Sequence, residues 1–165
     1  MKKILILGHM RSGKDTMAEI LNDKFGLSFR SSSEAACDKF IFDELKDANG
    51  YTSKEECFND RFNHRDEWYD YICDYNKDDR ARLAKEILND VDCYVGMRDL
   101  EEFEECINQQ LFDKVIWVDA SDRLPDETGS FNIPKKYADI IVDNNGTFDD
   151  FEQKVAELGE ELLYV

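Results

Sequence analysis

The stretch KKILILGHMRSGKDT, residues 2–16, decides the fold of this chain. Its apolar run Ile4–Leu7 ends at Gly8, and Gly13-Lys14-Asp15-Thr16 opens a pattern typical of a helix. A strand, a glycine-rich turn and a helix in this order predict a loop that binds phosphate. Glycine lets the backbone approach closely, so that successive N–H groups point at phosphate oxygens, and the N-terminus of the helix adds its dipole.

Lys14 adds a mobile cation to this loop, and the stretch therefore predicts binding of a nucleotide polyphosphate. Asp15 stands where Ser or Thr commonly gives a hydroxyl to Mg²⁺. A carboxylate there can hold a hard cation directly or through water, and Thr16 is the neighbouring hydroxyl. The alternative for Asp15 is an acidic residue favoured in the first turn of a helix.

Length and charge restrict the classes of protein and partner. With 165 residues the chain is expected to form a single domain, 1–165. Its 38 acidic and 21 basic residues give a formal net charge of -17, which argues against a nucleic-acid surface or an anionic membrane as partner. The five cysteines show no Cys-x-x-Cys spacing, so we expect free thiols in a reducing compartment and a cytoplasmic protein. The N-terminal apolar run is too short for a signal peptide or a membrane span.

Four more apolar segments predict strands, and helical patterns separate them. The expected strands lie at 27–30, 92–97, 114–118 and 137–142. The expected helices cover 14–25, from Ser32 or Ser33 to 46, 80–88, 100–110, and from a Thr147 cap to 163, with more helix inside 51–90. This alternation predicts an α/β fold of three layers, with a five-stranded parallel sheet between two layers of helices.

Glycine and polar residues follow every expected strand. They are Gly8, Ser31, 96–98, 119–123 and 144–146. Because ligands of open parallel sheets bind at the carboxyl ends of the strands, we expect these segments to share one site. Asp119 closes an apolar strand as a Mg²⁺-binding acid would, and the alternative is an ordinary acid at a strand end. The proline-containing loop after it, 120–136, carries Arg123 and has the length of a lid.

The region 31–90 offers further candidates. Ser32 or Ser33 can cap a helix or contact a ligand, and both can hold at once because a helix N-terminus binds anions. Arg61, His64 and Arg65 are cations gathered in an acidic chain and can receive a phosphate. The alternative for each of the three is an exposed ion-pairing residue.

Three segments resemble P-loop kinases of nucleoside monophosphates, in particular the deoxynucleoside monophosphate kinases of bacteriophages. The segments are GHMRSGKDT (8–16), GMRDLEE (96–102) and YADIIVDNNGTFDDF (137–151). The resemblance implies the P-loop nucleoside triphosphate hydrolase fold of the nucleotide kinase type, with 31–90 as a helical acceptor-binding region and 120–136 as a lid-like loop. If the chain is encoded by a phage, the resemblance implies that the protein is located in the host cytoplasm.

The resemblance also implies a role for individual residues. ATP phosphates and Mg²⁺ would be held by Gly8, Arg11, Ser12, Gly13, Lys14, Asp15 and Thr16, with Asp119 as a further candidate for the metal. Arg123 would lie beside ATP as the lid arginine, and Asn145-Gly146 would flank the adenine. Arg98 would grip the phosphate of the acceptor, with Glu102 orienting it or supporting its helix. Ser33, Glu34 and Arg65 complete the expected acceptor site, and the expected catalytic residues are Lys14, Arg11, Arg98 and Arg123.

The expected reaction is in-line transfer of the γ-phosphoryl group from MgATP to a (deoxy)nucleoside monophosphate. Gly96 replaces the acid of the family's Asp-x-Arg segment, so a non-catalytic ATP-binding module is one alternative. A kinase for another small acceptor, such as dephospho-coenzyme A, is a second. A regulatory GTPase is disfavoured because no Asn-Lys-x-Asp motif follows any expected strand. The expected partners are ATP and a small nucleotide, and the sequence leaves open whether the chain forms a homodimer.

Overall fold

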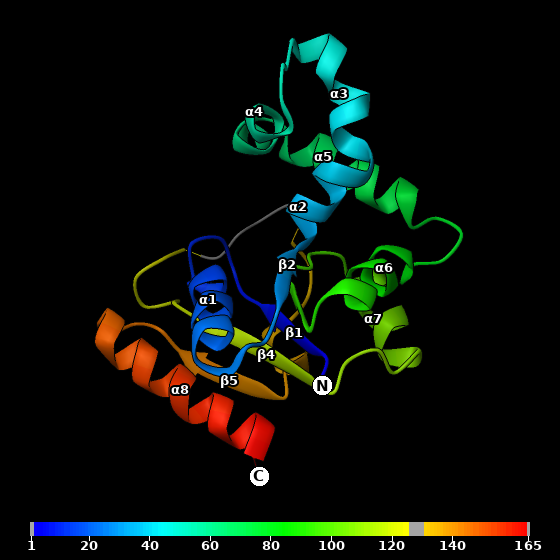
Figure 1. Cartoon of the computed structure of the whole chain (residues 1–165). Helices are drawn as coiled ribbons and strands as arrows, with labels where there is room; N and C mark the ends of the chain where they lie inside the picture. The colour runs from blue at the N-terminus through cyan, green and yellow to red at the C-terminus, as the bar shows by residue number, and fades with distance from the viewer. Residues whose placement is uncertain (1, 126–130, 165) are drawn as a thin grey trace.

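A computed structural model describes residues 2–125 and 131–164, which form a five-stranded parallel sheet covered by helices (Figure 1). The strand order is β2-β3-β1-β4-β5, and every neighbouring pair is parallel. The strands are β1 (Ile4–Leu7), β2 (Phe29–Ser31), β3 (Cys93–Val95), β4 (Lys114–Asp119) and β5 (Ile140–Asp143). The expected fold class is therefore confirmed.

β1 lies at the centre of the sheet, and all four of its side chains are fully buried. Successive side chains of a strand point to opposite faces. Ile4 and Ile6 accordingly join one hydrophobic cluster, while Leu5 and Leu7 join the other. A central strand that is apolar on both faces requires a layer of helices on each side.

Helices α1 (Lys14–Phe25) and α8 (Phe148–Tyr164) cover the face of Ile4 and Ile6, and they lie side by side in Figure 1. Met17 and Leu21 of α1 and Phe151 and Val155 of α8 are buried there. The predicted cap of α8 is confirmed, because the N–H of Asp150 donates to Thr147 Oγ1 at 3.2 Å.

Helices α6 (Arg82–Asp90) and α7 (Leu100–Asn108) contribute to the core on the opposite face. Leu83 and Ile87 of α6 and Phe103 of α7 pack in the same cluster as Leu5 and Leu7. Among residues 2–125 and 131–164, no helix combines the length and the apolar character needed to cross a membrane.

The remaining helices form a lobe, residues 32–75, that projects from the sheet (Figure 1). It begins directly after β2, so it rises from the carboxyl edge of the sheet, and Ile41, Cys57 and Trp68 anchor it in the core. Its elements are α2 (Ser32–Ala36), the π-helical turn η1 (Cys37–Ile41), α3 (Phe42–Asn49), α4 (Lys54–Asn59), the 3-10 turn η2 (Arg61–Asn63) and α5 (Arg65–Tyr75).

Several predicted boundaries were wrong by a few residues. The cap of α2 is Ser31, whose Oγ accepts the N–H of Glu34 at 3.0 Å, and not Ser32 or Ser33. β3 is shorter than expected because the backbone turns at Gly96, with φ +91°. Tyr137 belongs to a 3-10 turn, η3 (Lys135–Tyr137), that precedes the last strand. Residues 126–130 of the expected lid lie outside the described residues.

Truncation of Phe151 tests the packing of α8 behind the phosphate loop. Phe151 is 2% exposed, so we expect Phe151→Ala to lower the free energy of unfolding by roughly 3–5 kcal/mol. Phe148 lies on the same helix and is 58% exposed. Phe148→Ala should therefore change the free energy of unfolding by less than about 0.5 kcal/mol. Urea unfolding measures both variants, and equal losses would contradict the assigned packing.

Candidate functional site

The loop between β1 and α1 has the backbone conformation of an anion-binding turn. Arg11 and Gly13 both have positive φ, +65° and +108°, and the N–H of Ser12 donates to the carbonyl of His9 at 3.1 Å. Alternation of left- and right-handed residues makes neighbouring N–H groups converge on a concave anion site. A side chain at position 13 would also collide with Asn144, so glycine is required there for space as well as for φ.

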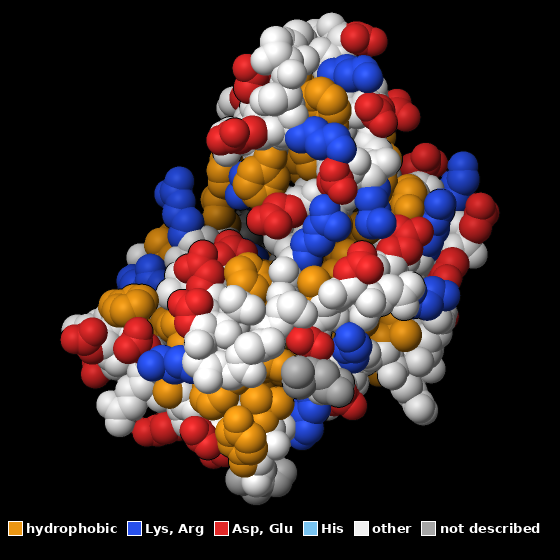
Figure 2. All heavy atoms as spheres, in the orientation of Figure 1, with side chains coloured by type: hydrophobic (Ala, Val, Ile, Leu, Met, Phe, Trp, Pro, Cys, Tyr) orange, Lys and Arg blue, Asp and Glu red, His pale blue; other side chains and the backbone are white. Residues whose placement is uncertain are grey.

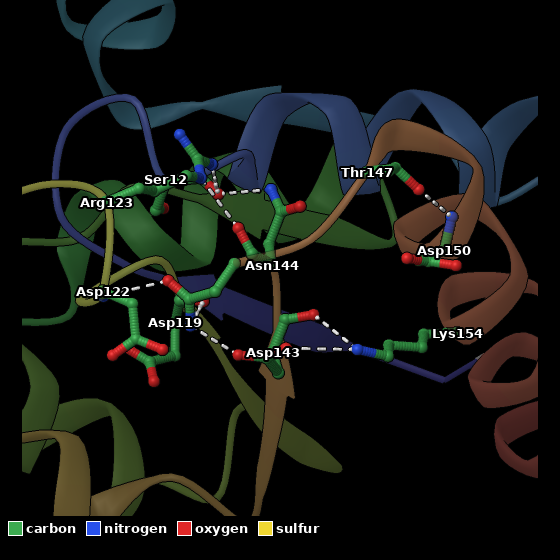
Figure 3. Close-up of polar contacts among 10 residues, drawn as sticks. Ser12, Asp119, Asp122, Arg123, Asp143, Asn144, Thr147, Asp150 and Lys154 are labelled. Carbon is green, nitrogen blue, oxygen red and sulfur yellow. Dashed lines mark hydrogen bonds and ion pairs between the residues drawn. The ribbon is translucent and has the colours of Figure 1, made fainter.

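The loop is held from behind through the carbonyl of Ser12. This oxygen accepts one hydrogen bond from Asn144 Nδ2 at 2.7 Å and one from the guanidinium of Arg123 at 3.2 Å (Figure 3). Arg123 Nε in turn donates to the carbonyl of Asn144 at 2.8 Å. Arg123 therefore lies against the outer side of the loop, where its first role is to brace the turn. Asn144 was expected at the site only as part of the segment 144–146, and a role was expected for its neighbours Asn145 and Gly146 alone.

Asn145 belongs to the same bracing group, which joins the ends of β4 and β5. Its Oδ1 accepts the N–H of Asp122 at 2.9 Å, and its Nδ2 donates to the carbonyl of Asp119 at 3.4 Å (Figure 3). The carboxylate of Asp119 accepts the N–H of Ser121 at 3.1 Å and lies 3.9 Å from Lys135 Nζ. Asp119 does not line the cavity described next, and its role toward a metal stays a prediction.

A cavity of about 430 Å³ opens between the phosphate loop and the helical lobe. Figure 2 shows the hollow beneath the lobe, bordered by hydrophobic, acidic and basic side chains. The predicted residues that line it are Arg11, Lys14, Asp15, Ser33, Glu34, Arg65, Arg98 and Glu102. The structure thus brings residues of the expected phosphate loop and the expected acceptor residues to one cavity, whereas Arg123, Asn145 and Gly146 do not line it.

Three guanidinium groups converge at this cavity, those of Arg61, Arg65 and Arg98. Arg61 stacks on two aromatic rings, with its Cζ 4.0 Å from the Phe58 centroid and 4.4 Å from that of Phe62. Burial lowers the pKa of Arg61, and the charges of Arg65 and Arg98 act in the same direction. A guanidinium stays protonated even so, and three such cations concentrate positive charge in an acidic protein.

His64, a third candidate cation of the lobe, does not line the cavity. Its Nδ1 lies 2.9 Å from Glu67 and its Nε2 3.1 Å from Asp60, and the bond to Glu67 contributes most to raising its pKa. His64 therefore matches the alternative of an ion-pairing residue. Arg61 was considered with it but was left out of the expected acceptor site, because helical spacing alone does not say which face closes over a ligand.

Two tyrosine–carboxyl pairs occupy another part of the cavity wall. Tyr69 on α5 donates to Asp99 Oδ1 at 2.6 Å, and Tyr94 on β3 donates to Glu102 Oε1 at 2.6 Å. Glu102 is 2% exposed, and burial raises the pKa of its carboxyl to about 8. Neither tyrosine was predicted, because a tyrosine within an apolar or amphipathic run carries no local signal of its partner.

Gly96 follows β3 at the edge of the cavity, and it replaces the acid expected from the resemblance. A Cβ at this position would lie 3.5 Å from Lys14 Cε, and φ is +91°. The position thus has room beside Lys14 but has a backbone that only glycine adopts readily.

Asp15 and Thr16 remain the candidates for Mg²⁺. Asp15 lines the cavity within electrostatic range of Arg61. The described residues contain no cluster of three or more His, Cys, Asp or Glu side chains that could hold a metal by themselves. The role of Asp15 and Thr16 toward Mg²⁺ stays a prediction.

Comparisons with known proteins show similarity in structure but not in sequence. No protein-family model matches the sequence, and no curated protein matches it. The structure is similar to a shikimate kinase from Bacteroides thetaiotaomicron, with 12% identity, a TM-score of 0.53 and 99% of both chains covered. It is similar to the dephospho-CoA kinase from Campylobacter jejuni, with 16% identity, a TM-score of 0.53, and 97% of this chain and 96% of that chain covered. A gluconokinase from Sinorhizobium meliloti 1021 has 13% identity and a TM-score of 0.51, with coverage of 99% and 96%.

The fold of this chain is that of the P-loop kinases. At such low identity the likeness concerns the fold alone, so the acceptor has to be argued from the cavity. The bacteriophage branch of the resemblance stays a prediction.

The pKa of Glu102 makes a prediction about stability. Burial raises its pKa from the ordinary 4.5 to about 8 on folding, so between these pH values the carboxyl is ionised in the unfolded state but protonated in the folded state. The free energy of unfolding therefore falls, through Glu102, as the pH rises from about 4.5 to 8. Above about pH 8 the Glu102 term no longer changes with pH. Glu102→Gln, which mimics the protonated form, should gain thermal stability relative to the natural chain between pH 5 and pH 8.5.

Glu104→Gln is the matched control, since Glu104 is exposed on the same helix. Its melting temperature relative to the natural chain should not change with pH in this range. If the difference in melting temperature between Glu102→Gln and the natural chain is also independent of pH, the Glu102 carboxyl ionises normally.

Proposed function

We propose that this protein transfers the γ-phosphoryl group of ATP to a (deoxy)nucleoside monophosphate, as the resemblance to the bacteriophage kinases implies. The observation that carries the proposal is the convergence of Arg61, Arg65 and Arg98 on a cavity that also contains Lys14. A site with one phosphate loop and a second group of cations suits two phosphorylated ligands that face each other. Arginine is well suited to hold a phosphate through paired hydrogen bonds.

The remaining walls favour a nucleotide over a smaller acceptor. Phe58, Phe62, Trp68 and Tyr69 line the cavity, and flat aromatic surfaces suit a planar base. A volume of about 430 Å³ lies in the range of sites that enclose a ligand of this size. A kinase for a hydroxylated sugar would need more hydrogen-bonding groups in place of these rings.

The mechanism requires alignment and positive charge more than covalent chemistry. The amides of the loop and Lys14 would neutralise the β- and γ-oxygens of ATP, and Arg11 would approach the transferred group. Arg98, with Arg61 and Arg65, would hold the acceptor phosphate in line. The acceptor needs no general base, because a monophosphate is already ionised near neutral pH.

Two groups act around this centre. Mg²⁺ bound with ATP would supply further positive charge at the phosphates, and Asp15 with Thr16 would hold it. Arg123 braces the Ser12 carbonyl on the far side of the loop, near Asn145. In this position it would maintain the shape of the loop and lie beside the nucleoside of ATP.

Removal of Lys14 should abolish the reaction. We expect Lys14→Ala to fold normally and to show no acceptor-dependent release of ADP, since Lys14 is the cation assigned to the β- and γ-oxygens of ATP. Circular dichroism verifies the fold, and a coupled assay follows ADP from MgATP with each common nucleoside and deoxynucleoside monophosphate. A Lys14→Ala variant of unchanged activity would refute the assigned site.

Removal of a cavity arginine should affect the acceptor more than ATP. Arg61→Ala and Arg98→Ala should each raise the KM for the acceptor roughly ten- to a hundredfold, because each removes a charge-assisted hydrogen bond, and should leave the KM for ATP nearly unchanged. Arg82→Ala is the control, since Arg82 stacks on Tyr75 outside the cavity. Unaltered acceptor kinetics in both cavity variants would mean that the acceptor binds elsewhere.

A further inference from the structure

The cavity has two ends of different chemistry. The groups within electrostatic range of Arg61 are Asp15, Arg65, Arg98 and Glu34, which mark the end beside the phosphate loop. The groups that act on Glu102 are Tyr94 and Asp99. Cys73 joins this second end, since Asp99, Tyr69 and Glu102 all act on it. Arg80 also acts on Cys73 but does not line the cavity, and it pairs with Glu101 at 3.2 Å.

The hydroxyl groups at the second end are already used as hydrogen-bond donors. The hydroxyl of Tyr69 donates to Asp99 and that of Tyr94 donates to Glu102, both at 2.6 Å. The hydroxyl of Ser32 donates to the carbonyl of Gly96 at 3.0 Å. Apart from the indole N–H of Trp68, this end can therefore offer a ligand mainly the acceptor capacity of two carboxyl groups.

Glu102 is the group whose bonding is incomplete. In the part of the chain that the structure describes, Tyr94 is the one side chain that hydrogen-bonds its carboxyl, through Oε1, although the residue is 2% exposed and lines the cavity. The indole N–H of Trp68, 5% exposed in the same wall, also lacks an acceptor among the described residues. Buried polar groups of proteins are normally paired, so incomplete pairing on a cavity wall points to a ligand that completes it.

We infer that Glu102 selects the base of the acceptor, and that the preferred acceptors carry an exocyclic amino group: guanine, adenine or cytosine in place of thymine or uracil. The inference rests on the proposed function and concerns the same cavity. With the phosphate at the arginine end, the base reaches the second end, where Glu102 Oε2 accepts an amino N–H.

The bases differ in what they present to a carboxylate. Adenine, cytosine and guanine carry amino groups that donate, whereas thymine presents the O4 carbonyl in the place of the cytosine amine. A carboxylate oxygen repels such a carbonyl, and burial makes the loss larger because neither group is solvated. Glu102 thus discriminates by penalising the wrong base as well as by binding the right one.

Protonation of Glu102 sets the pH at which this preference is strongest. Burial raises its pKa to about 8, so in the empty site the Glu102 carboxyl is protonated near neutral pH. In that state it could donate a hydrogen bond to a carbonyl of the base. Tyr94 on β3, Cys106 on the same helix as Glu102, and Tyr69 and Cys73 on α5 keep their protons, because burial raises the pKa of each. Asp99 is the other carboxyl that faces Glu102. The preference for amino bases should therefore increase from pH 6.5 to pH 8.5.

The first test uses the natural chain at pH 8.5 with MgATP. Its kcat/KM is measured for the monophosphates of guanosine, adenosine, cytidine, uridine and thymidine, each as ribo- and deoxyribonucleotide where available. We expect at least one amino-bearing base to exceed both uracil and thymine by roughly tenfold or more. Equal or higher values for uracil or thymine overturn the inference and leave the proposed function standing. Turnover of no nucleotide overturns both.

The second test exchanges the hydrogen-bonding character of Glu102 without changing its shape. In Glu102→Gln, Tyr94 still donates to Oε1, so the amide nitrogen takes the place of Oε2 and presents a donor to the cavity. The ratio of kcat/KM for amino bases to that for uracil or thymine should fall roughly tenfold or more. Glu104→Gln on the same helix should leave the ratio unchanged.

A purely structural role for Glu102 predicts a different outcome. It would lower kcat/KM for all bases by one common factor and leave their ratio and its pH dependence intact. That result overturns the inference.

Discussion

The whole site depends on one turn of backbone, the turn after β1, because the positions of all its cations are defined relative to that turn. Positive φ at Arg11 and Gly13 directs the amides inward, and such angles are unfavourable for an arginine unless the surroundings hold them. The surroundings do so through two carbonyls of the loop: that of Ser12 accepts hydrogen bonds from Asn144 and Arg123, and that of Arg11 accepts a longer one from Arg123. A pair of side chains from the ends of β4 and β5 thus fixes the conformation of a loop that follows the central strand.

The second constraint is electrostatic. A chain with a formal net charge of -17 repels polyanions at long range, so any site for a phosphorylated ligand requires a local concentration of cations. Arg61 is placed against Phe58 and Phe62, where stacking orients the guanidinium while its N–H groups still reach the cavity. Elsewhere on the cavity wall, the carboxyl groups of Asp99 and Glu102 are bound to tyrosine hydroxyls.

Local patterns in the sequence were sufficient for the fold and for the phosphate loop. The run Ile4–Leu7 followed by glycine and lysine carries its own conformation, and apolar segments with caps such as Thr147 mark the other elements. The acceptor end of the cavity was harder to predict, since Arg61, Tyr69 and Trp68 lie on helices whose spacing shows that a face is buried but not against what. Pairing of Tyr94 with Glu102 arises only once β3 and α7 are packed, so no short motif records it.

Phe151 and Asn144 come late in the chain, yet both lie against Gly13 near its beginning. During synthesis the first strand and helix leave the ribosome long before the segment that shapes the turn between them. A fragment that ends before β5 and α8 would therefore have the sequence motif but would lack the two side chains that pack against its turn.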